Sequence, residues 1–178
     1  MHTTRTFRLI FISLLIAQSL ALFVFEGLIP LPFVVPGAKL GLANLITVIA
    51  LYTLPSRRDV LLILAVRVLL ATMFGGGPTI FLYSMSGALI SFAAMCLLKE
   101  TGWFSLLGVS AAGGFFHNLG QLLTAVLVLQ TPGLWLYLPV LAAVGIATGL
   151  LIGLAAHLTV RRLQRLPVFQ QLTDDIQK

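Results

Sequence analysis

The chain has very little charge for its size. Of its 178 residues, 11 are Lys or Arg and 5 are Asp or Glu, so charged side chains make up 9% of the sequence. A soluble domain carries about 25% charged residues, and so few cannot cover the surface of a soluble globule of this mass. With 59% apolar residues and a mean hydropathy of +1.07, the composition excludes a soluble protein and indicates an integral membrane protein.

Reactive groups are equally scarce. The protein has a single cysteine, Cys96, and therefore cannot form an internal disulfide. Cys96 lies in an apolar run, where we expect it to serve as a small apolar side chain. The three histidines do not have metal or haem spacing. There is no Walker motif, and the only aspartate pair, Asp174 and Asp175, lies alone in the polar tail. We therefore expect no catalytic residues, no metal and no cofactor.

The net charge of +6 suggests nucleic acid at first sight, but we expect no nucleic-acid partner. In a membrane protein, Lys and Arg accumulate in cytoplasmic loops. Most of the 11 basic residues fall in four segments: Arg5 and Arg8, then Arg57 and Arg58, then Lys99, then Arg161, Arg162 and Arg165. The intervening loops contain no Lys or Arg. This pattern predicts that both termini lie in the cytoplasm.

Long apolar runs that do not alternate with polar residues favour helices over a transmembrane barrel. We expect six spans, at about residues 7–25, 37–54, 59–74, 79–98, 104–129 and 134–160. The first run is too long for the apolar region of a signal peptide and is not followed by a good cleavage site, so we expect it to be retained. The prediction is an all-α polytopic domain over residues 1–162, followed by a short polar cytoplasmic tail over residues 163–178.

Small residues at four-residue spacing mark close helix packing in a membrane. They are Gly145, Gly149 and Gly153 in the last span, Ala17 and Ala21 in the first, and Gly37 and Gly41 at the start of the second. For the glycine ridge of the last span we favour packing within the chain. For the alanine pair, docking of another protein is an alternative of nearly equal weight.

Polar groups fall within three predicted spans: Asn44, Arg67, and the group His117, Asn118 and Gln121. Ionisable groups in the hydrocarbon are costly and point to function. Asn44 and Arg67 each lie roughly 12 Å from a span end, at 1.5 Å per residue, and His117 lies near the middle of its span. These depths predict a buried polar cavity that binds a substrate. The alternatives are that Arg67 clamps helix carbonyls and that His117 is simply hydrogen-bonded in the bundle.

Two charges flank the first outer loop. Glu26 closes the first span and Lys39 opens the second. A cation at a helix N-terminus opposes the helix dipole, so Lys39 needs a partner. It either forms an ion pair with Glu26 or, with Arg67 below it, receives an anionic ligand from outside.

Four stretches of this sequence carry a resemblance to a known family. They are PGAKLGLAN at residues 36–44, LAVRVLLATMFGG at 64–76, YSMSG at 83–87 and GGFFHNLGQ at 113–121. The chain resembles, over roughly residues 17–153, the bacterial family known both as heptaprenyl diphosphate synthase component I and as Gx transporter. The resemblance implies a multi-pass protein of the bacterial cytoplasmic (inner) membrane.

That family is similar to the substrate-binding S components of energy-coupling factor transporters. The likeness implies a six-helix bundle in which a small-xxx-small motif, matched by Ala17 and Ala21, docks to an energy-coupling membrane subunit that works with ATPases. The synthase name implies instead a soluble synthase subunit as partner.

Three functions stay open at this stage. The first is a transporter subunit that binds a small anionic or amphipathic ligand from outside. The second is a non-catalytic accessory subunit of polyprenyl diphosphate or menaquinone synthesis that binds a prenyl diphosphate or quinone. The third is a membrane scaffold of a redox or transport assembly. Whether the chain takes part in an enzyme stays equally open, because the family name implies a synthase component while the residues offer no catalytic machinery.

Overall fold

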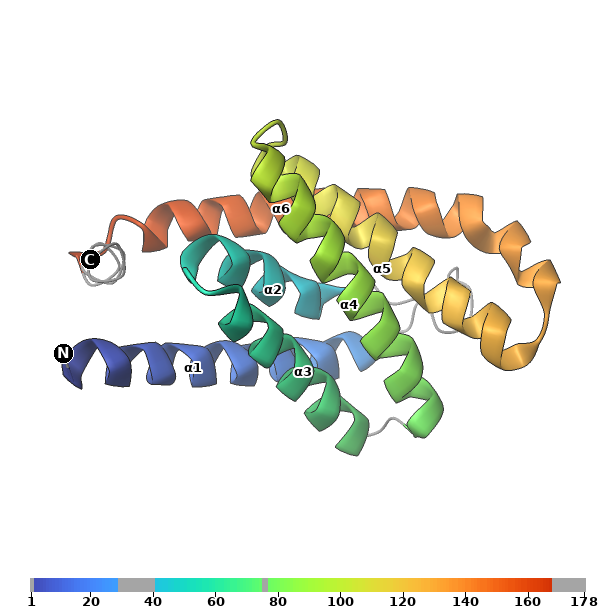
Figure 1. The fold of residues 1–178 in the computed structure, drawn as a ribbon, viewed down its shortest axis with the longest axis horizontal. Coiled ribbons are helices and arrows are strands. Elements are labelled where there is room, and N and C mark those ends of the chain that lie inside the picture. The colour runs from blue at the N-terminus through green and yellow to red at the C-terminus, as the bar shows by residue number, and fades with distance from the viewer. Residues whose placement is uncertain (1, 29–40, 75–76, 168–178) are drawn as a thin grey trace.

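The computed structural model describes residues 2–28, 41–74 and 77–167 (Figure 1). Its elements are α1 (His2–Gly27), α2 (Leu42–Thr53), α3 (Arg57–Met73), α4 (Pro78–Thr101), α5 (Leu106–Leu129), the 3₁₀ helix η1 (Pro132–Tyr137) and α6 (Leu138–Leu163). The described part of the chain contains no strand. The all-α prediction is confirmed.

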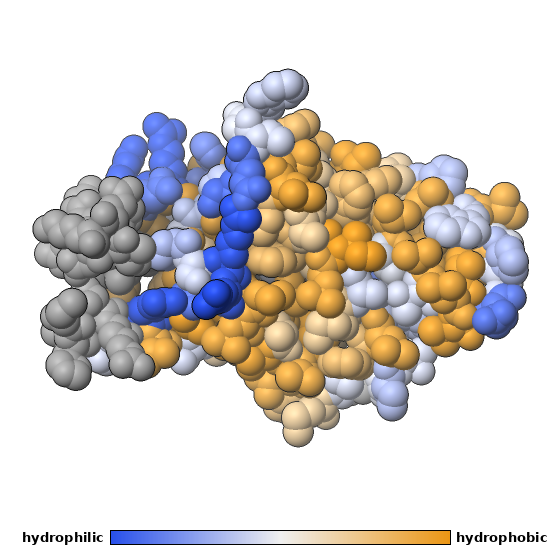
Figure 2. Space-filling model, in the orientation of Figure 1, coloured by the Kyte–Doolittle hydropathy of each residue, from blue (hydrophilic) through white to orange (hydrophobic). Residues whose placement is uncertain are grey.

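Four segments are long and apolar enough to cross a membrane: Thr6–Glu26, Phe81–Thr101, Leu106–Leu129 and Pro132–Leu163. Figure 2 shows apolar residues across the middle of this face of the molecule. Hydrophilic residues gather mainly toward the end where α1 begins and α6 finishes, and a smaller group lies at the opposite end. This distribution is that of a multi-pass membrane protein.

The second and third predicted spans form shorter helices. Helix α2 has 12 residues, or roughly 18 Å at 1.5 Å per residue, and the predicted part before Gly41 lies outside the described residues. Gly41 itself is the N-cap of α2 with φ 77°, so it serves a left-handed turn rather than helix packing. Helix α3 has 17 residues and contains Arg67. For these two helices, membrane crossing remains a prediction.

Helix α2 lies between α1 and α6 in the middle of the molecule (Figure 1). Most of its residues are buried, and the side chains of Val48 and Ala50 are completely so. A helix that is apolar on nearly all sides lies either in a protein core or in the lipid of a membrane, and the burial of α2 by its neighbours places it in the core. The short α2 is therefore the centre of the bundle, and the helices packed around it carry the long apolar faces.

Polar contacts join the helix ends that carry the basic residues. Arg8 of α1 makes a bidentate pair with Asp59 of α3, with both N···O distances 2.7 Å. Arg57 pairs with Glu100 at the end of α4, and Lys99 donates a hydrogen bond of 2.5 Å to the carbonyl of Leu51 in the last turn of α2. The start of α1, the end of α2, the start of α3 and the end of α4 therefore meet.

Three glycines of α6, Gly145, Gly149 and Gly153, lie so close to α5 that an added Cβ would crowd its atoms. A Cβ on Gly149 would lie 2.6 Å from the carbonyl oxygen of Ser110, and one on Gly145 would lie 2.7 Å from that of Gly114. A Cβ on Gly153 would lie 3.0 Å from the Cβ of Ser110. The Ser110 hydroxyl donates to the Gly149 carbonyl at 2.7 Å, which is possible only because the two backbones approach so closely.

We predict that Gly149→Ala lowers stability, because its methyl group must push α5 and α6 apart. Overpacking of this kind costs about 1–3 kcal/mol. Gly133→Ala is the matched control, since no heavy atom lies within 4 Å of the added Cβ, and it should change stability by less than about 0.5 kcal/mol. Thermal unfolding in detergent measures both. Equal stability of the two variants would contradict the close α5–α6 contact.

Candidate functional site

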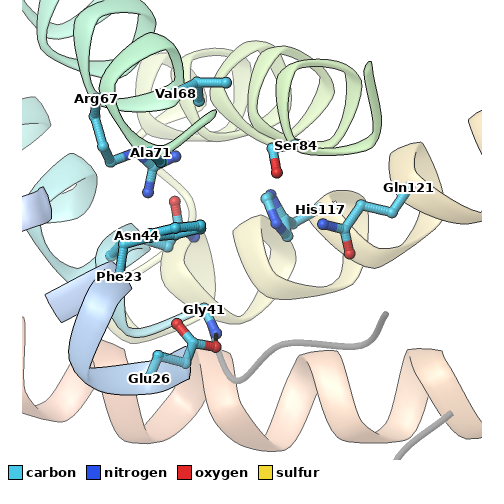
Figure 3. A pocket seen from close by; sticks show the side chains of 11 residues that line it. Phe23, Glu26, Gly41, Asn44, Arg67, Val68, Ala71, Ser84, His117 and Gln121 are labelled. Atoms are coloured by element: carbon cyan, nitrogen blue, oxygen red, sulfur yellow. Dashed lines mark hydrogen bonds between the residues drawn. The ribbon is translucent and has the colours of Figure 1, made fainter. Parts of the chain in front are cut away.

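A polar cavity lies where the first five helices meet (Figure 3). Its lining residues are Phe23 and Glu26 of α1, Gly41, Ala43 and Asn44 at the start of α2, Arg67, Val68 and Ala71 of α3, Ser84 of α4, and His117 and Gln121 of α5. The empty space is about 410 Å³ when its opening to solvent is included. Only about 30 Å³ of it is wide enough to hold the centre of a water molecule. In this state the cavity has room for a few waters or a small ion.

Arg67 brings the one cationic side chain among the described residues that line this cavity. The residue is 6% exposed, and its Nε has no hydrogen-bond partner among the described residues. A buried guanidinium N–H that lacks a partner costs free energy. Figure 3 shows the side chain reaching from α3 toward Asn44. A hydrogen-bond acceptor that entered the cavity would give the Arg67 Nε the partner that it lacks among the described residues.

Glu26 is the carboxylate of the cavity and is 4% exposed. Its Oε1 accepts a hydrogen bond from the backbone N–H of Gly41 at 2.6 Å, and its Oε2 accepts one from that of Leu42 at 3.0 Å. These amides belong to the N-cap and first residue of α2, where the helix dipole also favours negative charge. Glu26 and Arg67 attract each other through their charges.

Uncharged polar groups complete the lining. Asn44, in the first turn of α2, is 6% exposed. His117 and Gln121 lie one turn apart on α5 and both face the cavity, with Ser84 of α4 opposite (Figure 3). The structure thus brings Asn44, Arg67, His117 and Gln121 together in one cavity, as their similar depths in the sequence suggest.

Asn118 has a different environment. Its Nδ2 donates a hydrogen bond of 2.8 Å to the carbonyl of Leu141 on α6, and the residue is 5% exposed. It lines a second, smaller cavity, which shares Gly41, Asn44 and His117 with the first. The geometry makes Asn118 a link between α5 and α6 beside the main cavity.

The other predicted site residues lie elsewhere. Lys39, and with it the Glu26–Lys39 pair, falls outside the described residues. Ala17 and Ala21 are exposed on α1 and line neither of these two cavities.

Sequence reasoning missed three features of the cavity. The sequence places Glu26 at the outer loop, although a carboxylate in an apolar helix is itself a functional signal. The spacing of Gly41 predicts helix packing, and no sequence pattern marks Ser84 as a ligand group. Only the folded chain shows that the start of α2 returns to the end of α1.

The lining offers several groups that can bind a ligand. Arg67, Asn44 and Gln121 offer N–H donors, and among the described residues no group of three His, Cys, Asp or Glu could hold a metal ion. A guanidinium in a low-dielectric site holds carboxylate or phosphoryl oxygens strongly. The arrangement suits a small oxyanion.

A family model described as heptaprenyl diphosphate synthase component I matches residues 15–159. The chain belongs to this family. The match confirms the resemblance seen in the sequence motifs, and it contains all the described lining residues of the cavity. No curated protein and no solved structure matches this member of the heptaprenyl diphosphate synthase component I family. The family description implies a component that works with synthase partners.

We predict that Arg67→Met leaves thermal stability in detergent unchanged or raises it. Replacing a buried charge by an apolar side chain of similar length removes its desolvation cost, and Glu26 keeps its two amide donors. Asn118→Ala is the comparison, because it removes a hydrogen bond between helices and should cost about 0.5–1.5 kcal/mol.

A loss of about 3–5 kcal/mol in Arg67→Met is the value expected when a structural ion pair is broken. That result would make Arg67 a clamp between helices and remove the reason to treat it as a ligand group.

Proposed function

We propose that this protein is a membrane-embedded binding subunit that takes a small oxyanionic ligand into the cavity around Arg67. The observation that carries the proposal is the buried guanidinium whose Nε has no hydrogen-bond partner in the part of the chain that the structure describes. Placing a charge at the centre of a spanning helix costs about 2.5–3.5 kcal/mol on insertion scales. A role in pairing with a ligand explains why the protein keeps a charge that is costly to bury. Asn44, His117 and Gln121 orient the ligand, and Lys39 receives it from outside.

The proposal includes the topology. Six crossings with both termini in the cytoplasm would place the Arg8–Asp59 and Arg57–Glu100 pairs at the cytoplasmic surface. The membrane is then the bacterial inner membrane. The turn between α5 and η1, which carries Gln130 and Thr131 and no basic residue, would face outward.

We favour transport as the purpose of binding, with an S-component-like role. Ala17 and Ala21 are exposed on α1, where two small residues one turn apart let another helix approach closely. In this role they dock an energy-coupling membrane subunit that works with ATPases.

The second candidate is a non-catalytic accessory subunit of prenyl diphosphate or menaquinone synthesis. The family description favours it, because that description names a synthase component. Arg67 would then hold a diphosphate or a quinone oxygen, and a soluble synthase subunit would be the partner. The prenyl chain would have to lie outside the cavity, whose free space suits only a small group.

Native mass spectrometry of the protein purified gently from its own membrane tests the binding proposal. We predict a bound small anion in the wild type and its loss, at least tenfold in occupancy, in Arg67→Met, because a charge-assisted contact of about 1.5–3 kcal/mol is removed. A water-soluble anion supports transport, and a prenyl diphosphate or quinone supports the accessory role. Equal occupancy in the two proteins would contradict the role of Arg67.

The docking role of α1 is tested by the double variant Ala17→Leu and Ala21→Leu. We predict that it loses its membrane partner in co-purification while ligand occupancy is unchanged, because the added side chains block close helix approach. Ala155→Leu on the exposed face of α6 is the control and should keep the partner. Retention of the partner by the double variant would rule out this surface as the docking site.

A further inference from the structure

The N-terminus of α2 is built as an oxyanion site. Gly41 has φ 77° and ψ 30°, and the α-helix follows at once with Leu42. A left-handed residue followed by a right-handed one turns successive N–H groups toward the same point, which is the geometry of an anion-binding nest. Here the N–H groups of Gly41 and Leu42 form the nest, and the dipole of α2 adds to their positive potential.

This nest is filled by a side chain of the protein itself. Each carboxylate oxygen of Glu26 accepts one of the two N–H groups, at 2.6 Å and 3.0 Å. The match of two oxygens to two amides shows that the site fits a carboxylate. Glu26 comes from the last turn of α1 and is 4% exposed.

Arg67 is an independent sign of a ligand at this place. It lines the same cavity as Gly41 and Glu26, is 6% exposed, and its Nε has no hydrogen-bond partner among the residues that the structure describes. Figure 3 shows its side chain reaching toward Asn44, in the first turn of α2. The described lining therefore holds one guanidinium and one carboxylate. While Glu26 occupies the nest, its negative charge repels a second anion that enters the cavity.

We infer that the nest of Gly41 and Leu42 is the subsite for the oxyanion group of the ligand, and that Glu26 holds the place of this group until the ligand displaces it. The inference rests on the proposed function, since it assigns a position to the ligand bound beside Arg67. The ligand class is a carboxylate or phosphoryl compound that can present two oxygens to these two amides. Displacement of Glu26 frees the end of α1 from the start of α2, so binding and movement of α1 are coupled.

The affinity of purified protein for acetate and for inorganic phosphate, measured by isothermal titration calorimetry, tests the inference. We predict that Glu26→Gln binds the preferred anion about tenfold more tightly than the wild type, which corresponds to a subsite occupied by Glu26 about nine-tenths of the time. Preference for acetate identifies a carboxylate ligand, and preference for phosphate identifies a phosphoryl one. Glu100→Gln, which removes one carboxylate outside the cavity, is the control and should bind like the wild type.

The outcomes separate this inference from the proposed function. If Arg67→Met loses binding while Glu26→Gln binds no more tightly than the wild type, the cavity binds anions but Glu26 is only a helix cap. If no protein binds either anion, the oxyanion site itself is refuted.

Hydrogen–deuterium exchange of the wild type decides the matter even where Glu26→Gln does not fold. Addition of the anion should increase exchange of the α1 end, in peptides that contain residues 23–28, because Glu26 leaves the amides that fix it. Unchanged or slower exchange there would show that Glu26 stays in place and would overturn the inference.

Discussion

The fold is organised around a guanidinium that has to be accommodated inside an apolar helical bundle. Arg67 lies near the middle of α3 and is 6% exposed, so little water reaches its charge. Polar groups from the neighbouring helices surround it: the carboxylate of Glu26 from α1 supplies an opposite charge, and Asn44 from α2 and His117 and Gln121 from α5 line the same cavity. The short α2 contributes because its N-terminus falls inside the bundle, where the amides of Gly41 and Leu42 hold the Glu26 carboxylate at the cavity.

Two kinds of packing support the cavity. Helices α4, α5 and α6 meet at small residues with serine hydrogen bonds across each interface, Ser91 to the Gly113 carbonyl at 2.8 Å and Ser110 to the Gly149 carbonyl at 2.7 Å. Such contacts leave little freedom to slide. Helices α1 and α3 are joined by the Arg8–Asp59 pair at one end, and α1 meets α2 at the cavity through Glu26. In the proposed binding cycle, the end of α1 moves when the ligand displaces Glu26, while α4–α6 keep their packing.

The sequence predicted much of this and missed the rest for definite reasons. Composition and apolar runs indicate a helical membrane protein. The similar depths of Asn44, Arg67 and His117 in their helices predict that these polar groups share a buried cavity. Depth along a helix does not reveal rotation about its axis, so Asn118 was grouped with His117 although it faces α6. Spacing did not reveal that Gly41 adopts a left-handed conformation, because a glycine in that pattern also suits helix packing. The ion pairs Arg8–Asp59 and Arg57–Glu100 join residues distant in sequence, and helix order in space is not encoded in any local pattern.

The central claim is that the cavity around Arg67 is a binding site for an oxyanion. An experimental structure of the protein purified gently from its own membrane, at a resolution that shows ordered waters and ions, tests it most directly. The account predicts density for a non-protein oxyanion within hydrogen-bond distance of the Arg67 guanidinium, together with a changed position of Glu26. An Arg67 side chain bound only by protein carbonyls or carboxylates, with no non-protein density beside it, would contradict the account.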